Sequence, residues 1–174
     1  MTDQRSGVTI RGRRAEDWAA LYALCESQPS HLNPLEVPYR SEDTARTTFG
    51  AIPDNVNTFS LIAEEKGTLL GEITLRHVNR ERRRHIGIIE HLVLIHDARA
   101  TIGTPLLAAA LDLGINWLHL SRIETIVAID HTALIALYTA ASFTIEGTLR
   151  EYAYRQGSYV DAHMLAHISQ NTGR

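Results

Sequence analysis

The hydrophobic and polar positions along the first fifty residues predict one strand and two helices. Residues 8–14 (VTIRGRR) alternate apolar and polar side chains, which is typical of a strand. Residues 15–25 place apolar side chains at helical spacing, which predicts a helix. Residues 28–39 contain three prolines and are expected to be irregular. Ser41 is the expected N-cap of a second, short helix that ends near Gly50.

The middle of the chain predicts an antiparallel hairpin followed by a central strand. Two apolar runs, residues 57–65 and 68–78, flank the dipeptide Lys66-Gly67, a pattern that favours a hairpin. A polar turn at residues 79–85 leads to residues 86–95, which are apolar almost throughout. Such a run indicates a strand that is covered on both faces.

The second half predicts helix, strand, helix and a closing hairpin. A helix is expected from Pro105 to about residue 120, since proline suits the first helical turn. A strand at 122–129, a helix at 131–141 and strands at 143–154 and 159–168 follow, the last two joined by residues 155–158. The sum is a mixed sheet with helices on both faces, α+β or α/β, forming a single domain over residues 1–174.

Composition and charge narrow the function classes. The net charge of −3 argues against binding nucleic acid by bulk electrostatics. Cys25 is the only cysteine, which excludes an internal disulfide and a four-cysteine zinc site. No apolar run approaches the roughly 18 residues of a membrane span, and the first residues lack an apolar signal core. We therefore expect a reduced, cytoplasmic setting without membrane contact.

Four features carry candidate chemistry, each with a plainer alternative. Glu90 lies inside the most apolar strand, where burial would raise its pKa and suit a general base, unless an arginine on a neighbouring strand pairs with it. His91, expected on the opposite face, is the other candidate base. The Tyr138 hydroxyl either reaches a cleft at the sheet edge or packs in the core. The arginine-rich turn at residues 80–84 either contacts an anionic cofactor or an acidic subunit, or is solvated.

A metal site is not expected. His163 and His167 lie four residues apart on a predicted strand and share a face, but no third ligand stands at a recognised spacing. Half-buried histidines are the alternative.

The loop HDARATIG (residues 96–103) occupies a position that often holds phosphate, between a buried strand and an amphipathic helix. It has a single glycine, Gly103. Its composition leaves open whether it is a phosphate cradle or only a turn.

The order of elements, with LYTAASF followed by FTIEGTLREYAYRQGSYVDAHMLAHI, resembles the GNAT superfamily of acetyl-CoA-dependent N-acetyltransferases over nearly the whole chain. The last third is similar to the branch of bacterial L-amino-acid N-acetyltransferases. The resemblance implies a mostly antiparallel sheet of about seven strands, splayed between the fourth strand (86–95) and the fifth (122–129). It also implies acetyl-CoA as co-substrate, a small-molecule amine as acceptor, and a homodimer.

The resemblance assigns residues to the acetyl-CoA site. The pantetheine arm would pair with backbone groups around Leu92, Val93 and Leu94, and the pyrophosphate would bind N–H groups of the loop and helix start, where the helix dipole is positive. The cofactor-binding residues so implied are Leu92, Val93, Leu94, Ala98, Arg99, Ala100, Thr101, Ile102, Gly103, Thr104, His131 and Tyr138.

The chain departs from the family pattern at four of its positions. In the loop motif Q/R-x-x-G-x-G/A the first position is Ala98 and the first glycine is Thr101, so that only Gly103 matches. His131 stands where the family has asparagine, and Ser142 replaces the glycine of L-Y-x-x-x-G-F. If Thr101 strains the backbone, acetyl-CoA affinity would fall by about 1–3 kcal/mol.

The mechanism that the resemblance implies is direct acetyl transfer. Glu90 would take the proton of the substrate ammonium, backbone N–H groups near Val93 would polarise the acetyl carbonyl, and Tyr138 would protonate the leaving thiolate or hydrogen-bond to it. His31, Asn33, Glu36 and Tyr39 of the early loop would line the substrate side. A non-catalytic binding module with impaired coenzyme A binding and a protein N-terminal acetyltransferase are the alternatives.

Overall fold

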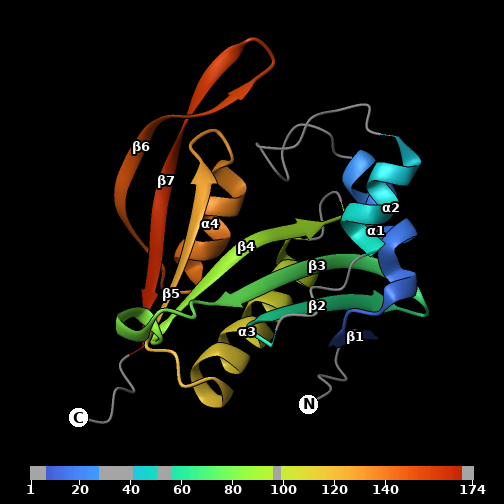
Figure 1. Cartoon of the computed structure of the whole chain (residues 1–174), viewed down its shortest axis with the longest axis horizontal. Helices are drawn as coiled ribbons and strands as arrows, with labels where there is room; N and C mark the ends of the chain where they lie inside the picture. The colour runs from blue at the N-terminus through green and yellow to red at the C-terminus, as the bar shows by residue number, and fades with distance from the viewer. Residues whose placement is uncertain (1–6, 28–40, 51–55, 96–98, 170–174) are drawn as a thin grey trace.

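The computed structural model describes residues 7–27, 41–50, 56–95 and 99–169, which form one seven-stranded sheet (Figure 1). The strand order is β1-β2-β3-β4-β5-β7-β6, and every neighbouring pair is antiparallel except β4 and β5. The mixed sheet predicted from the sequence pattern is confirmed, and so is the mostly antiparallel arrangement that the family resemblance implied. The strands are β1 (Val8–Gly12), β2 (Thr58–Glu65), β3 (Thr68–His77), β4 (Ile86–Leu94), β5 (Arg122–Ala128), β6 (Thr144–Arg155) and β7 (Ser158–Ile168).

Helices cover both faces of the sheet, as predicted. After a 3-10 turn at Ala15–Asp17, α1 (Trp18–Glu26) and α2 (Glu42–Gly50) lie together on one face, and α3 (Thr104–Asp112) and α4 (Thr132–Ala140) lie on the other. The predicted cap of α2 is confirmed, because the Ser41 hydroxyl accepts a hydrogen bond from the Thr44 N–H at 3.2 Å. No helix among the described residues is long and apolar enough to cross a membrane.

Both hairpin turns contain two residues with positive φ. Lys66 and Gly67 have φ values of 50° and 80°, and Gln156 and Gly157 have 51° and 83°. Positive φ at both central positions matches the twist of the flanking strands and makes a tight connection. The second turn is therefore shorter than the four residues expected, and β6 and β7 extend to it.

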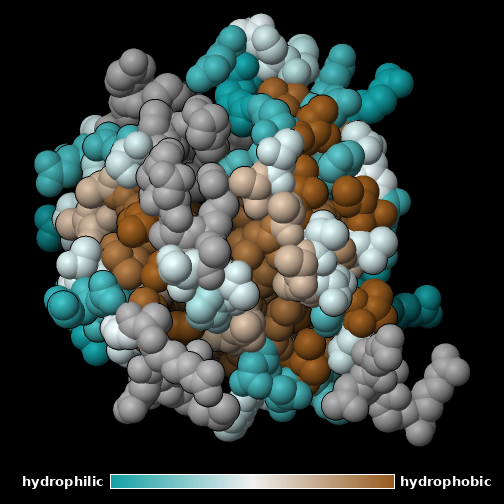
Figure 2. Space-filling view, turned by 180° about the vertical axis from the view of Figure 1, so that it is seen from behind, coloured by the Kyte–Doolittle hydropathy of each residue, from teal (hydrophilic) through white to brown (hydrophobic). Residues whose placement is uncertain are grey.

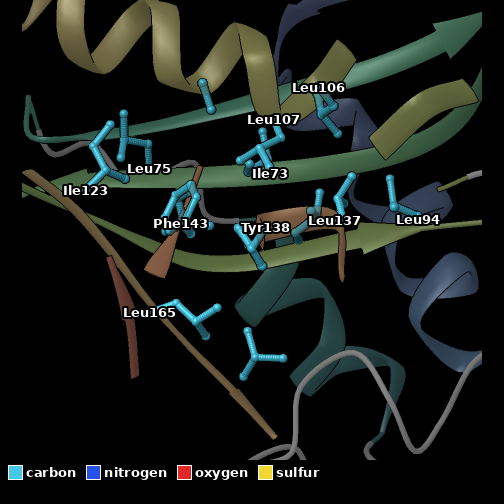
Figure 3. Close-up of a cluster of buried hydrophobic side chains, with 14 of the residues drawn as sticks. Ile73, Leu75, Leu94, Leu106, Leu107, Ile123, Leu137, Tyr138, Phe143 and Leu165 are labelled. Carbon is cyan, nitrogen blue, oxygen red and sulfur yellow. The ribbon is translucent and has the colours of Figure 1, made fainter. Parts of the chain in front are cut away.

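The main hydrophobic core lies between the sheet and the α3–α4 layer (Figure 3). Leu106 and Leu107 of α3 and Tyr138 of α4 pack against Ile73 and Leu75 of β3. Seen from behind, hydrophobic residues occupy the middle of the molecule and hydrophilic residues its periphery (Figure 2). This packing fixes the positions of the N-termini of the two helical segments, one after β4 and one after β5.

Candidate active site

The predicted splay between the fourth and fifth strands is present because β4 and β5 pair over only three residues. The parallel register joins Ile86–Ile88 to Arg122–Glu124 and then ends. Beyond this point the two strands diverge toward their carboxyl ends (Figure 1). The Thr125 hydroxyl donates to the Ile89 carbonyl oxygen at 3.2 Å. A side-chain hydrogen bond thus replaces the backbone ladder where the divergence begins.

The backbone of β4 presents hydrogen-bonding groups to this divergence. In an antiparallel pair, successive residues direct their N–H and C=O groups alternately toward the partner strand and away from it. The Ile95 N–H donates to the Leu70 carbonyl oxygen at 2.9 Å, which fixes the phase of the alternation. Val93 lies two residues before Ile95, so its N–H and C=O groups also point at β3. The N–H and C=O groups of Leu92 therefore point the other way, to the side from which β5 has diverged.

A bulge in β4 redirects the two candidate bases. The register of β3 against β4 shifts by one residue between Thr74 and Leu75, which leaves Glu90 as the extra residue of β4. A bulge bends the strand and re-aims its side chains. Glu90 contacts Arg76 and His91 contacts Thr74, so both side chains lie on the face that α1 and α2 cover. The prediction that they occupy opposite faces is wrong, because strict alternation fails at a bulge.

Glu90 is an exposed carboxylate in an ion pair. It pairs with Arg76 of β3, and the two side chains are 39% and 36% exposed. The expected burial of Glu90 is therefore wrong. The alternative, an arginine partner on a neighbouring strand, is what the structure contains. An exposed pair of this kind stabilises the fold by only about 0–1 kcal/mol.

A second carboxylate on this face, Glu72 of β3, is fully buried. Its side chain is 2% exposed, and its Oε1 accepts a hydrogen bond from Arg13 Nη1 at 3.1 Å. Its Oε2 lies 3.2 Å from His91 Nε2. The same ring nitrogen is 3.1 Å from the Thr74 hydroxyl, which also shares a hydrogen bond with Ser60 at 2.8 Å. No local sequence pattern predicts this network, because it joins residues of four separated segments.

Tyr138 lies in the core with its hydroxyl at the β4–β5 divergence. The residue is 1% exposed, and its ring meets Phe143 edge-on at a centroid distance of 5.0 Å (Figure 3). Its hydroxyl hydrogen-bonds to Thr125, the residue that contacts Ile89. Burial raises the pKa of the Tyr138 phenol well above its ordinary value of 10, and the Thr125 hydrogen bond offsets part of that rise. The phenol is therefore a hydrogen-bond donor at neutral pH.

The end of α4 holds the Tyr138 ring in place. The Phe143 N–H donates to the Tyr138 carbonyl oxygen and the Ser142 N–H donates to that of Thr139, both at 3.0 Å. These are the two hydrogen bonds of a Schellman cap, which requires a left-handed residue at its hinge. Ser142 occupies that hinge with φ of 65°. The family's glycine at this position is replaced, yet the turn that favours glycine is kept.

The loop after β4 is helical where the structure describes it. Arg99–Gly103 forms a π-helical turn that continues into α3, so the helix begins earlier than predicted. Thr101 is exposed and does not have positive φ, so its side chain causes no left-handed strain. Gly103 is itself helical, with φ of −64°. A Cβ on it would lie 2.8 Å from a methyl group of Leu94 and 3.0 Å from one of Leu137, so these side chains would have to shift.

Two helix N-termini lie at the same end of the parallel strand pair. The helical segment beginning at Arg99 follows β4, and α4 follows β5 with His131 as its N-cap. The His131 carbonyl accepts hydrogen bonds from the N–H groups of Leu134 and Ile135 at 3.0 and 3.1 Å. Free N–H groups and the positive ends of helix dipoles attract anions. In the loop, Ile102 is buried against the core and Thr104 is exposed.

Several predicted site residues lie outside the described residues or are described by their backbone alone. Ala98 and the substrate-side candidates His31, Asn33, Glu36 and Tyr39 lie outside the described residues. The backbone of Arg99 and Ala100 belongs to the π-helical turn. The position of these residues in an active site therefore stays a prediction.

The arginine-rich turn is exposed and lies away from the loop, and the two histidines contact neighbouring residues of the fold. Residues 80–84 are exposed and precede β4, whereas the loop follows it, so the turn lies at the opposite end of the strand. His163 Nδ1 lies 3.1 Å from the Thr148 hydroxyl, and His167 Nδ1 lies 3.1 Å from the Ala141 carbonyl oxygen. Among the described residues, no group of three or more His, Cys, Asp or Glu side chains is placed to hold a metal ion.

Comparisons with known proteins agree with this architecture. The family model described as an acetyltransferase (GNAT) domain matches residues 10–164. The L-amino acid N-acetyltransferase AaaT of Escherichia coli strain K12 is 28% identical to this chain over 163 residues. The alignment covers 94% of this chain and 99% of the relative.

Solved structures share the fold. A putative acetyltransferase from Salmonella typhimurium, solved with its cofactor acetyl-CoA, superposes with a TM-score of 0.78 at 15% identity. The superposition covers 97% of this chain and 98% of the Salmonella chain. A chimera of the spermidine N-acetyltransferase SpeG from Vibrio cholerae has a TM-score of 0.78 at 20% identity, covering 94% and 96%. The divergent parallel strands, the two helix starts beside them and the match over residues 10–164 together show that this chain belongs to the GNAT family of N-acetyltransferases.

Proposed function

We propose that this protein transfers the acetyl group of acetyl-CoA directly to the primary amine of a free amino acid. The observation that carries the proposal is the divergence of β4 from β5, where the Leu92 backbone is presented beside two helix N-termini. An extended pantetheine arm pairs with a strand edge of this kind, and a pyrophosphate binds helix N-termini. The acetyl-CoA-bound structure of the Salmonella relative supports the choice of co-substrate.

Tyr138 serves the departing thiolate of coenzyme A. Its hydroxyl is held by Thr125 at the start of the divergence, next to the strand edge that receives the thioester. Because burial raises its pKa, the phenol keeps its proton and stabilises the thiolate by hydrogen bonding. Tyr138→Phe should lower kcat more than it weakens acetyl-CoA binding. Unchanged turnover in this variant would remove Tyr138 from the mechanism.

Charge on the acceptor side favours a zwitterion over a polyamine. The two carboxylates described on this face, Glu72 and Glu90, are each paired with an arginine, Arg13 and Arg76. A spermidine-like polycation would have to displace Arg76 from Glu90, because Glu72 is buried and out of its reach. A free amino acid brings one ammonium and one carboxylate, so it matches the exposed Glu90–Arg76 pair, which presents one anion and one cation. The amino-acid activity in the name of the Escherichia coli relative points the same way.

Binding is the first test of this proposal. Purified protein should show a higher melting temperature with acetyl-CoA and with coenzyme A. At 100 times the dissociation constant, a ligand stabilises the folded state by about 2.7 kcal/mol, which corresponds to a shift of roughly 5–10 °C for a chain of this size. No shift at millimolar ligand would support instead a binding module that has lost coenzyme A.

Turnover is the second test and identifies the acceptor class. Thiol release from acetyl-CoA is followed with the twenty amino acids, spermidine and peptides with free N-termini as acceptors. We expect the highest kcat/KM with a free amino acid. Preference for peptides would favour protein N-terminal acetylation, and preference for spermidine would contradict the charge argument.

The expected homodimer and cytoplasmic setting accompany this proposal. β6 is an edge strand, and Ile126 of β5, Ile145 of β6 and Ile168 of β7 are each at least 40% exposed. Pairing of such an edge with a second copy would cover it. Light scattering during gel filtration should give twice the mass of the chain, and a monomer at micromolar concentration would contradict the dimer.

A further inference from the structure

The buried Glu72–His91 pair has the geometry of a carboxylate that orients a catalytic histidine. Glu72 Oε2 lies 3.2 Å from His91 Nε2. The carboxylate side chain is 2% exposed and the imidazole 30% exposed, so the first is locked in the sheet while the second reaches the surface. Arg13 lies against the other carboxylate oxygen at 3.1 Å and balances its charge. A buried carboxylate without such partners would be strongly destabilising.

The hydrogen bonds determine which ring nitrogen carries the proton. An ionised carboxylate only accepts hydrogen bonds, so Nε2 of the neutral His91 ring must donate to Glu72. The Thr74 hydroxyl, 3.1 Å from the same Nε2, is itself tied to Ser60 at 2.8 Å. The ring contacts both Thr74 and Glu72 through Nε2. Nδ1 therefore carries the lone pair, which is the form required of a general base.

The bulge sets His91 beside the divergence of β4 from β5. His91 directly precedes Leu92, whose backbone is presented to that divergence, and it follows the bulged residue Glu90. Its side chain emerges on the α1–α2 face, opposite the core that holds Tyr138. An acetyl group held at Leu92 would thus have the Tyr138 hydroxyl on one side and His91 on the other.

Glu90 is less suited to accept the proton. Its carboxylate is already engaged by Arg76, and protonation would break that ion pair. Protonation of His91 has the opposite effect, because the imidazolium gains an ion pair with Glu72. Among the described residues, the ion pairs nearest to the ring in the sheet are Glu72 with Arg13 and Glu90 with Arg76.

We propose that His91 is the general base of acetyl transfer and that Glu72 is its positioning residue. The inference rests on the proposed acetyltransferase function. The substrate ammonium gives one proton to His91 Nδ1, and its nitrogen lone pair forms the bond to the acetyl carbonyl carbon. The carbon–sulfur bond breaks and its electron pair leaves with sulfur. Of the two protons left on nitrogen, one ends on the thiol of coenzyme A and one remains in the amide. His91 then releases its proton to water.

The first test compares steady-state kinetics of variants that keep the fold. His91→Gln should lower kcat about a hundredfold or more, the range of general-base catalysis, while the dissociation constant of acetyl-CoA changes less than about threefold. His77→Gln is the matched control, since His77 also lies on the sheet but bonds to the Arg84 carbonyl oxygen far from Leu92. A larger kcat loss in Glu90→Gln than in His91→Gln would overturn the assignment.

A chemical-rescue experiment separates a catalytic role from a structural one. Added imidazole should restore part of the kcat of His91→Gly and leave the wild-type rate unchanged. A deficit that imidazole does not change, with acetyl-CoA still bound, would indicate that His91 only shapes the site. Failure of the wild-type enzyme to acetylate any amine would refute the proposed function, a result distinct from a normal rate in His91→Gln.

The positioning role of Glu72 has a readout independent of activity. Long-range proton–nitrogen NMR spectra, assigned by comparison with His91→Gln, should show the Nε2–H tautomer of His91 in the wild-type protein. Glu72→Gln should shift the ring toward a mixture of tautomers. Predominance of the Nδ1–H form in the wild-type protein would contradict the arrangement. A Glu72→Gln protein that melts at the wild-type temperature yet keeps full kcat would also contradict it.

Discussion

Ser142 holds a left-handed conformation at the end of α4, and replacing it with glycine should stabilise the protein. Its φ is 65°, in a Schellman cap closed by the Phe143 and Ser142 N–H groups. A left-handed conformation costs a non-glycine residue roughly 1–2 kcal/mol. The greater freedom of glycine in the unfolded chain offsets about 0.5–1 kcal/mol of this. Ser142→Gly should therefore raise the free energy of unfolding by about 0.5–1 kcal/mol.

Urea unfolding followed by circular dichroism gives the free energy directly, and the melting temperature should rise by about 1–4 °C. Variants at the same position separate conformational strain from helix propensity. Stability should fall in the order Gly, Asn, Ser, Val, because asparagine tolerates a left-handed backbone and a β-branched residue does not. Ser142→Ala should stay close to the wild-type protein.

The result that would refute this reasoning is an alanine variant more stable than the glycine variant. Alanine is the best helix former, so that order would mean that residue 142 behaves as a helical position. A lower slope of free energy against urea in Ser142→Gly would instead indicate a change in the unfolded or folded state beyond the hinge.

Further predictions concern the loop and the buried phenol. Gly103→Ala should lower stability by about 1–3 kcal/mol in urea unfolding, because its Cβ would lie 2.8 Å from Leu94, whereas Gly147→Ala, with nothing within 4 Å, should change little. Thr101→Gly, which restores a family glycine, should change the dissociation constant of acetyl-CoA less than about tenfold by calorimetry, since Thr101 is not left-handed. Tyr138 has a raised pKa, so its contribution to stability is present below about pH 10 and is lost as the pH rises further. Between about pH 9 and 11, the free energy of unfolding should depend less on pH in Tyr138→Phe than in the wild-type protein, by up to about 1.4 kcal/mol per pH unit. Equal slopes of this free energy against pH in the two proteins would contradict the burial of the phenol.

The elements of the fold were predictable because each depends on neighbours in the sequence. Alternation predicted β1 and the first hairpin, a proline and an apolar stripe predicted α3, and a hydroxyl residue predicted the start of α2 at Ser41. The helical turn at Arg99–Gly103 was not predicted, because the loop residues contain no recognisable N-cap pattern. The splay between β4 and β5 came from the family resemblance and not from periodicity, and their parallel pairing was not predicted.

The site depended on contacts that no local pattern contains. The sequence showed an unusual carboxylate in an apolar strand, and that signal was real, but the structure gives Glu90 an exposed partner in Arg76. The buried carboxylate is Glu72, in a strand whose sequence looked ordinary. Whether a carboxylate is buried depends on the strand across the ladder and on the helices above it.

The sequence by itself determined the strands, the helices, the order in which they alternate and the Tyr138-to-Phe143 segment that closes α4. The tertiary structure alone decided which side chains of β4 act together. A one-residue register shift against β3 turns Glu90 and His91 to the same face and brings Glu72 to the His91 ring. Register is a property of two paired strands far apart in the chain, so it is set by packing and not by the residues of either strand alone.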